Sequence, residues 1–219
     1  MRFFLFAVLF LAAVTARAVP FAIQLGDARL GLDAPPGFSD TALTGSPRIQ
    51  ELAEGLTSAS NRILLFAITD ADLRRFMAGD TPEFRRYMIV VTPRGLEYER
   101  VNAAAFATFV GDSLRELGKP PADADYLKYL EAQPTGRVSL LAELRKEPEV
   151  VSVLQGTRLP QARSSESQQY LLSTTTLLLL RGKALSVSVY TLYAGAADVD
   201  WIRFMTGRWV EELQRLNSR

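Results

Sequence analysis

The 219-residue sequence contains no cysteine and no histidine. Without cysteine the chain has no disulfide, no thiolate nucleophile, no zinc-ribbon ligands and no cysteine for lipid attachment. Without histidine it cannot assemble a Ser-His-Asp triad or the imidazole sites that hold most catalytic zinc ions. Enzymes that lack both residues exist, so these absences favour a binding role over catalysis without deciding the question. We expect no cofactor and no metal site.

Excess charge of either sign is also lacking. The chain has 25 basic and 24 acidic residues, a formal net charge of +1. Hydrophobic residues make up 48% and charged residues 22%, which is the composition of a globular protein and not of a disordered one. A chain of this length can bury about 70% of its unfolded surface, so it needs no cross-links to fold. A near-neutral protein has no electrostatic basis for holding nucleic acid.

The first 18 residues have the order of a secretory signal peptide. Arg2 gives the positive start, Phe3 to Val14 form an uncharged run of twelve residues, and Ala16-Arg17-Ala18 is an A-x-A cleavage site. The alternative is a membrane anchor, but a transmembrane helix needs about 20 apolar residues. We therefore predict cleavage after Ala18 and a periplasmic product without stable membrane insertion. Residues 19–219 would form a single globular domain with 23 basic and 24 acidic residues, net −1, because Arg2 and Arg17 are removed.

The first half of this domain alternates segments typical of strands and of helices. Apolar segments on either side of Gly26-Asp27 predict a hairpin, which Pro35-Pro36-Gly37 ends. Ser46-Pro47 predicts the start of a helix, because serine caps free amides and proline is tolerated at the first helical position. The segments expected after it are a strand at 62–69, a helix from Asp70 to Gly79, a strand at 87–92, a helix from Asn102 to Gly118, and a helix that begins at Asp123 or Asp125 and ends before Pro134.

The C-terminal third predicts an antiparallel meander. Strands at 138–144 and 150–154 are followed by a polar stretch at 158–169 and by two long strands, Tyr170 to Leu180 and Ala184 to Tyr193. Gly182 supplies the positive φ that a tight turn between the long strands requires. The first long strand is apolar on both faces at its end, so we expect this hairpin in the middle of the sheet.

The last predicted strand has one face of large side chains and one of small side chains. Leu185, Val187 and Val189 alternate with Ala184, Ser186 and Ser188. The small side chains allow a helix to approach closely. The chain then ends in a predicted amphipathic helix, capped by Asp198 or Asp200, with the apolar stripe Trp201, Met205, Trp209, Leu213 and Leu216.

Three of these features together resemble the exported bacterial type of the Mog1/PsbP-like α/β/α sandwich. They are the N-terminal hairpin running into LDAPPGF at Leu32 to Phe38, the late meander, and the close LLLLRGKALSVSVYTLY followed by tryptophan in the terminal helix. Residues 95–135 have no counterpart in the resemblance. It implies an α+β fold with a predominantly antiparallel sheet and C-terminal meander flanked by helices, and a binding or accessory role. It transfers no site residue, because this fold has no shared catalytic motif.

Three pairs of aspartates could supply carboxylates for acid–base chemistry. They are Asp70 with Asp72, Asp123 with Asp125, and Asp198 with Asp200. Each pair lies at the start of a predicted helix, where carboxylates cap free amides and favour the helix dipole, and none has the spacing of a calcium-binding loop. We interpret them as helix caps.

The other polar and aromatic candidates also have simpler interpretations. No lysine has the S-x-x-K spacing of a serine–lysine dyad, and we expect all four to be solvated: Lys119, Lys128, Lys146 and Lys183. Six arginines between 70 and 100 are matched by six acids, which favours a balanced surface over an anion site: Arg74, Arg75, Arg85, Arg86, Arg94 and Arg100. Trp201 and Trp209 share one helical face and are expected in the core and not in a ligand cage. No nucleotide-binding glycine motif is present.

Three functional hypotheses follow. The first is an exported, non-enzymatic binding or accessory protein that presents one edge or helix face of the sandwich to an envelope protein. The second is a carrier or sensor of a small apolar ligand held between the sheet and the Trp201–Leu216 helix. The third is a histidine-free hydrolase that works with carboxylates. The sequence assigns no catalytic, cofactor-binding, metal-binding or partner-binding residue.

Overall fold

The computed structural model describes residues 20–122, 125–161 and 168–218. The predicted signal peptide at 1–18 and Asp123 lie outside these residues. The strands are β1 Phe21–Leu25, β2 Ala28–Leu32, β3 Phe38–Asp40, β4 Asn61–Thr69, β5 Arg86–Pro93, β6 Val138–Glu147, β7 Val150–Arg158, β8 Tyr170–Leu180 and β9 Lys183–Leu192. The helices are η1 Thr41–Thr44, α1 Pro47–Gly55, α2 Asp70–Met77, η2 Arg94–Leu96, α3 Ala103–Leu114, η3 Arg115–Leu117, α4 Tyr126–Glu131 and α5 Ala196–Asn217, with η marking 3₁₀ helices.

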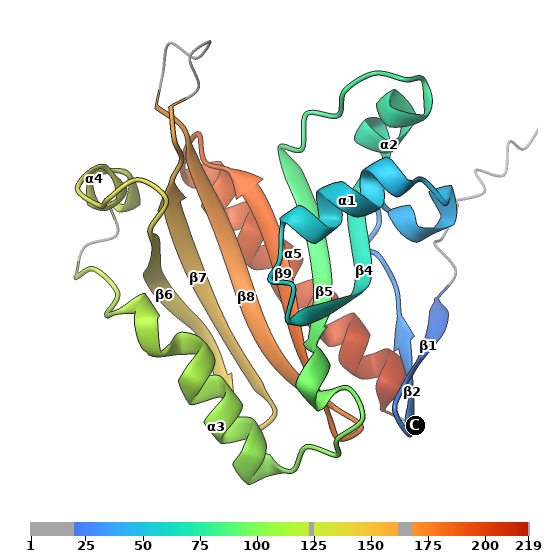
Figure 1. Cartoon of the computed structure of the whole chain (residues 1–219). Coiled ribbons are helices and arrows are strands. Elements are labelled where there is room, and N and C mark those ends of the chain that lie inside the picture. The colour runs from blue at the N-terminus through green and yellow to red at the C-terminus, as the bar shows by residue number, and fades with distance from the viewer. Residues whose placement is uncertain (1–19, 123–124, 162–167, 219) are drawn as a thin grey trace, which may run out of the picture.

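Seven strands form one sheet in the order β3-β4-β5-β9-β8-β7-β6, and every neighbouring pair is antiparallel. Strands β6 to β9 pair in chain order, so the predicted meander is confirmed. The β8–β9 hairpin lies in the middle of the sheet, as predicted. Its turn residues Arg181 and Gly182 have φ of 52° and 77°. Helices cover both faces of the sheet (Figure 1), which confirms the α+β class.

The back layer, behind the sheet in Figure 1, contains the long helix α5. Its side chains pack on the large-residue face of β9, against Leu185, Val187 and Val189. The β1–β2 hairpin and α4 contribute to the same core. Gly195 is the N-cap residue of α5, so the predicted cap at Asp198 or Asp200 is wrong. The helix begins before both residues, and the Asp198 carboxylate accepts from the Ala194 amide (2.9 Å).

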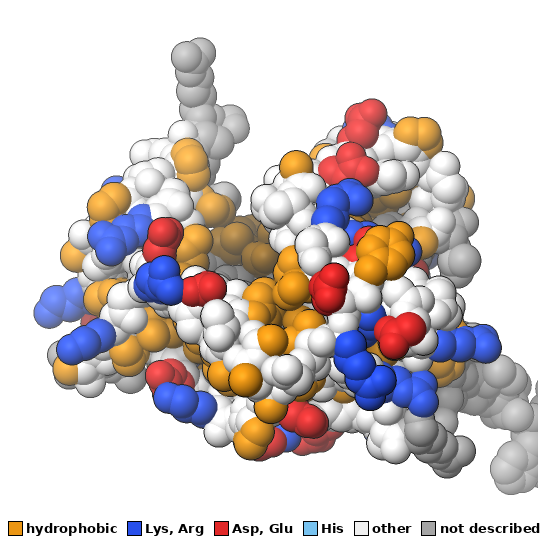
Figure 2. All heavy atoms as spheres, turned by 60° about the horizontal axis from the view of Figure 1, so that its bottom comes forward, with side chains coloured by type: hydrophobic (Ala, Val, Ile, Leu, Met, Phe, Trp, Pro, Cys, Tyr) orange, Lys and Arg blue, Asp and Glu red, His pale blue; other side chains and the backbone are white. Residues whose placement is uncertain are grey.

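The front layer is made of separate short helices. Helices α1 and α2 pack on β4 and β5, and α3 packs on the end of β8 and β9 nearest their turn. On the small-residue face of β9, Ala184 packs in the cluster under α3, and Tyr190 packs against the cluster under α1 and α2. Large apolar residues of α5 need large partners, so the long helix takes the opposite face. Figure 2 shows the molecule hollowed between the part that carries α3 and the part that carries α1 and α2.

Helix capping agrees with the sequence in part. Asn102 caps α3 by accepting from the Ala105 amide (2.9 Å), and Asp125 caps α4 by accepting from the Lys128 amide (3.1 Å). Ser46 precedes α1, with Pro47 at the first position, but its side chain makes no capping hydrogen bond. Strand β3 is too short to be predicted from its sequence. Among the described residues no helix has the length and apolar character to cross a bilayer.

Candidate functional site

Four of the described aspartates make hydrogen bonds that serve local structure: Asp70, Asp72, Asp125 and Asp198. At α2 the cap is Thr69, whose hydroxyl accepts from the Asp72 amide (3.1 Å), so the predicted cap at Asp70 or Asp72 is wrong. Asp70 instead accepts from the Ser39 hydroxyl (2.7 Å), and Asp72 accepts from the Glu83 amide (2.8 Å). Within the described residues no three acidic side chains gather as metal ligands would.

Lys183 is a buried cross-link at the start of β9. Its ammonium group pairs with the Asp27 carboxylate (2.9 Å) and donates to the carbonyls of Glu99 (2.9 Å) and Glu97 (3.3 Å). The Lys183 side chain is 0% exposed, so the prediction of a solvated lysine is wrong. The reason lies in the tertiary structure, because the β1–β2 hairpin folds over the β8–β9 turn. Gly26 leaves room for the ammonium group, since a Cβ at this position would lie 2.7 Å from the Lys183 nitrogen.

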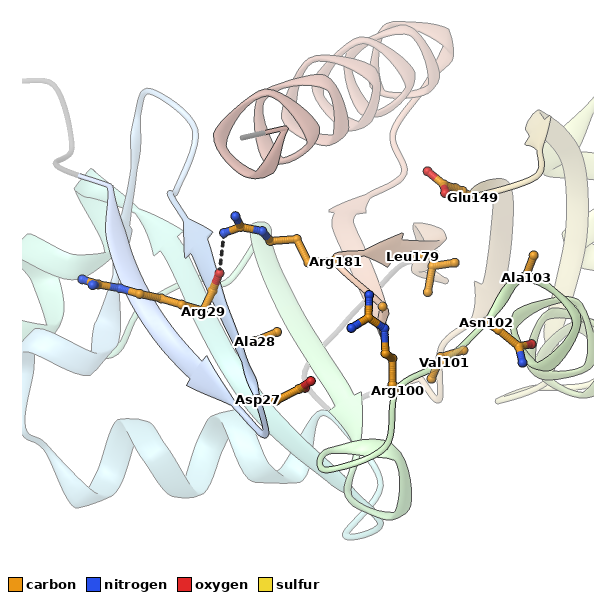
Figure 3. A pocket seen from close by; sticks show the side chains of 11 residues that line it. Asp27, Ala28, Arg29, Arg100, Val101, Asn102, Ala103, Glu149, Leu179 and Arg181 are labelled. Atoms are coloured by element: carbon orange, nitrogen blue, oxygen red, sulfur yellow. Dashed lines mark hydrogen bonds between the residues drawn. The ribbon is translucent and has the colours of Figure 1, made fainter.

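An open cavity of about 810 Å³ lies beside this cross-link (Figure 3). The Arg100 side chain points into it, and Arg181 reaches across to donate to the Arg29 carbonyl (3.0 Å). The Arg29 guanidinium points away from the cavity. Because Lys183 and Arg181 both join the β1–β2 hairpin to the β8–β9 turn, we interpret this cavity as part of a structural joint.

The two tryptophans of α5 have different environments. Trp209 is 1% exposed, and its indole N–H donates to the Asp33 carbonyl (2.7 Å), so its predicted core position is confirmed. Trp201 is half-buried, with the Arg86 guanidinium 4.0 Å from its ring centroid. Fully buried side chains such as Ile202 and Leu213 fill the space between α5 and the sheet. That space does not match the ligand position of the carrier hypothesis.

The outer edge of β4 is the candidate functional site. Strand β3 pairs with Ala67, Ile68 and Thr69 alone. In the described part of the chain no strand pairs with this side of β4 over Asn61–Phe66. Alternate residues of an edge strand direct their N–H and C=O groups outward, and these groups can pair with another extended chain.

Side-chain contacts end β3 and turn the chain away from the edge of β4. The Thr41 hydroxyl donates to the Phe66 carbonyl (2.9 Å). The Asp40 carboxylate accepts from the Ala42 amide (3.2 Å). Burial raises the pKa of Asp40, although hydrogen bonding to backbone amides opposes the shift. The chain turns into η1 at this point, so the outer side of Arg62–Leu65 has no strand partner.

A cavity of about 700 Å³ runs along the open edge. Its walls come from η1, α1, β4 and the loop before it, and Arg94 closes one end. Ile49 and Ala53 of α1 are buried and give it an apolar wall. Gln50 and Glu54, joined by a hydrogen bond of 3.0 Å, form the exposed rim. The edge therefore lies in a groove with an apolar wall and a polar rim, and not on a flat surface.

The opposite edge of the sheet differs. Strand β6 has two register shifts in its pairing with β7. Its last residues include Glu143, Arg145, Lys146 and Glu147. Bulges and charged side chains are the features that keep edge strands from pairing with other chains. Strand β4 has one such shift, between Ile63 and Leu65, and its charged Arg62 is paired with Glu97.

Sequence reasoning did not find this site. It predicted β4 and α1 but not β3, and the open edge depends on how soon β3 ends. A signal was present in Asp40 and Thr41, both of which favour turns, immediately after a short apolar segment.

No protein-family profile and no curated protein matches this sequence. Among solved structures, the fold is similar to that of the Ran-binding protein Mog1p of Saccharomyces cerevisiae. The two chains are 13% identical, the match covers 92% of this chain and 94% of that one, and the TM-score is 0.39. The match is to the fold named from the sequence resemblance. The sheet order and the two helical layers described above are the evidence for the α+β class.

Proposed function

We propose that this chain is an exported, non-enzymatic binding protein that captures an extended segment of a partner protein at the outer edge of β4. The observation that carries the proposal is the outer side of β4 over Arg62–Leu65, which has no strand partner among the described residues and lies inside a groove. An added strand supplies main-chain hydrogen bonds for affinity, and the groove walls select its side chains. This deepens the first of the hypotheses drawn from the sequence, a sandwich that presents an edge.

The groove favours one direction and one charge pattern in the bound segment. All strand pairs of the sheet are antiparallel, so the segment is expected to continue the direction of β3, from Phe66 towards Asn61. Its first residues would then lie nearest Asp40, and its last residues would lie nearest Arg94. We expect a segment that is basic at its N-terminal end and acidic at its C-terminal end.

Peptide selection tests this proposal. Peptides selected from a random displayed library on the purified exported protein should be extended and carry the stated charge pattern. On binding, the outward amides within Arg62–Leu65 should exchange hydrogen more slowly, since these N–H groups become paired. Glu54→Lys, on the groove rim, should weaken binding of a selected peptide that places a basic side chain opposite Glu54 by about tenfold or more, because like charges repel.

The chain provides a matched control on the same helix. Glu51 is exposed on α1 but does not line the groove, so Glu51→Lys makes the same charge change outside it. It should leave peptide binding unchanged. Equal effects of the two variants, or protection of amides away from β4, would contradict the proposal.

Export remains part of the proposal. Cleavage after Ala18 would leave every described element intact, because β1 begins at Phe21. The partner would then be an envelope protein. N-terminal sequencing of the exported protein should read from Val19, whereas a retained Met1 or recovery in the membrane fraction alone would count against a cleaved periplasmic form.

A further inference from the structure

The cavity beside the Lys183 cross-link contains a guanidinium group that the structural joint does not use. Arg100 points into this cavity (Figure 3). The Asp27 carboxylate, which also lines the cavity, pairs with Lys183 (2.9 Å) and not with Arg100. Among the described residues the Arg100 guanidinium has no hydrogen-bond or ion-pair partner. Its charge and its five donors are therefore available to a molecule that enters the cavity.

Contacts along the chain hold Arg100 in this position. The segment before it is fixed by Lys183, which donates to the Glu99 carbonyl (2.9 Å). The segment after it is fixed by the Val101 amide, which donates to the Gly182 carbonyl (2.8 Å). The side-chain stem lies over Gly182, since a Cβ at Gly182 would lie 3.0 Å from Arg100 Cγ. A cationic group that is already positioned loses less conformational entropy when it binds a ligand.

A carboxylate without a partner lines the same cavity. Glu149 is exposed in the turn between β6 and β7, and its carbonyl accepts from the Leu179 amide (2.9 Å). In the described part of the chain its carboxylate has no hydrogen-bond or ion-pair partner. Leu179 and Gly182 are three positions apart at the end of one hairpin, so Glu149 and Arg100 are anchored near each other. No ion pair joins the two side chains, although they have opposite charges.

The other charged groups around the cavity are engaged or directed elsewhere. Asp27 is bound by Lys183. The Arg29 guanidinium points away from the cavity, and Arg181 donates to the Arg29 carbonyl (3.0 Å). The cavity therefore offers one available positive group, on Arg100, and one available negative group, on Glu149.

We propose that this cavity is a second binding site, which takes a small zwitterion, an amino acid or a short peptide. Arg100 holds the carboxylate of the ligand, because a guanidinium group can bind both oxygens of a carboxylate. Glu149 accepts from its ammonium group. Asn102 and Ala103, which line the cavity at the start of α3, add a setting that favours the negative end. The volume of about 810 Å³ is in the range of small-molecule sites. The proposal does not rest on the groove at β4.

The two charges select against simple ions. A ligand with only a negative charge is attracted by Arg100 but repelled by Glu149, and a ligand with only a positive charge meets the reverse. A zwitterion gains from both groups. The distance between its charged ends separates the two sources, because each residue of an extended peptide adds about 3.3–3.6 Å.

Titration of zwitterions of increasing length tests the proposal. Alanine, dialanine and trialanine are added separately, to about 10 mM, to the isotope-labelled exported protein observed by NMR, a range that detects a Kd near 1 mM. At least one should shift the signals of Arg100 and Gly182. Tightest binding of alanine indicates a free amino acid as ligand, and tightest binding of a longer form indicates a peptide. The N-acetylated and the C-amidated forms of the best binder each keep one charge and should bind about tenfold more weakly.

Variants connect binding to the two charged groups. Arg100→Gln removes the guanidinium and should weaken binding of the best zwitterion about tenfold. Glu149→Gln should weaken it by a similar factor but should not weaken binding of the N-acetylated form. Glu149 is exposed in a turn, so this variant serves if Arg100→Gln does not fold. Arg29→Gln is the matched control, because it makes the same charge change with a side chain that points away from the cavity.

Three results would overturn the proposal. The first is that none of the three zwitterions shifts the signals of Arg100 or Gly182. The second is that the singly charged forms bind as tightly as the zwitterion. The third is that Arg29→Gln weakens binding as much as Arg100→Gln or Glu149→Gln. Protection of the β4 amides by a selected peptide should be unchanged in the Glu149→Gln variant, so failure of one proposal is distinguishable from failure of the other.

Discussion

Replacing Trp209 by alanine tests whether α5 is part of the core or part of a partner-binding surface. The indole is 1% exposed and packs in the core between α5 and the sheet. Truncating a buried tryptophan to alanine costs about 3–5 kcal/mol in free energy of unfolding. The variant also loses the indole hydrogen bond to the Asp33 carbonyl. This bond contributes about 1 kcal/mol, part of which is already contained in the range given for the truncation. We expect a loss near 4 kcal/mol.

Two other substitutions on the same helix divide that loss into its causes. Trp209→Phe keeps an aromatic ring in the core but removes the indole N–H and some volume, so it should cost about 1–2 kcal/mol. Trp201→Ala removes a half-buried ring that stacks with Arg86, and it should cost about 1 kcal/mol or somewhat more. The expected order of destabilisation is therefore Trp209→Ala, then Trp209→Phe and Trp201→Ala.

Urea unfolding followed by far-ultraviolet circular dichroism measures these losses. With a slope of about 2 kcal/mol per molar urea, a loss near 4 kcal/mol moves the midpoint down by about 2 M. A Trp209→Ala variant that loses less than about 1 kcal/mol would refute a docked α5. A larger loss for Trp201→Ala than for Trp209→Ala would refute it as well, since it would reverse the burial of the two rings.

The turn and the buried lysine give two further predictions. Gly182→Val should lower the free energy of unfolding by about 1–2 kcal/mol, because φ there is 77° and the added Cβ would lie 3.0 Å from Arg100 Cγ. Thermal melts should show a smaller loss for Gly182→Asn. An unchanged Tm for Gly182→Val would argue against this turn. Lys183 lowers the pKa of Asp27, so the stability from this pair is complete above the ordinary pKa of 3.8 and is lost as the pH falls through the lowered value. Urea unfolding across acidic pH should therefore show a shallower decline for Asp27→Asn than for the unsubstituted protein.

The C-terminal meander could be predicted because its signals are local. The alternation from Val138 onward has the period of a strand, and the tight turn at Gly182 needs a residue that accepts positive φ. The start of α3 was also local, since Asn102 caps it within three residues. Such features depend on neighbours in the chain, which a sequence displays directly.

The joint at Lys183 could not be predicted, because it depends on distant segments. The ammonium group is bound by Asp27, 156 positions earlier, and by two carbonyls near η2. The open edge of β4 is of the same kind. It exists because Thr41 donates to Phe66 and ends β3 after three residues, and nothing in the β4 sequence records where its neighbour stops.

The difference between the two helical layers follows from helix lengths. Helix α5 has 22 residues and spans about 33 Å, close to the length of the ten-residue strand β9, since helices rise 1.5 Å and strands about 3.3 Å per residue. Helix α3 has 12 residues and spans about 18 Å, so it covers only part of a strand of that length. Of the small side chains of β9, which the sequence suggested would receive a helix, Ala184 packs under α3, close to the turn beside which that helix begins.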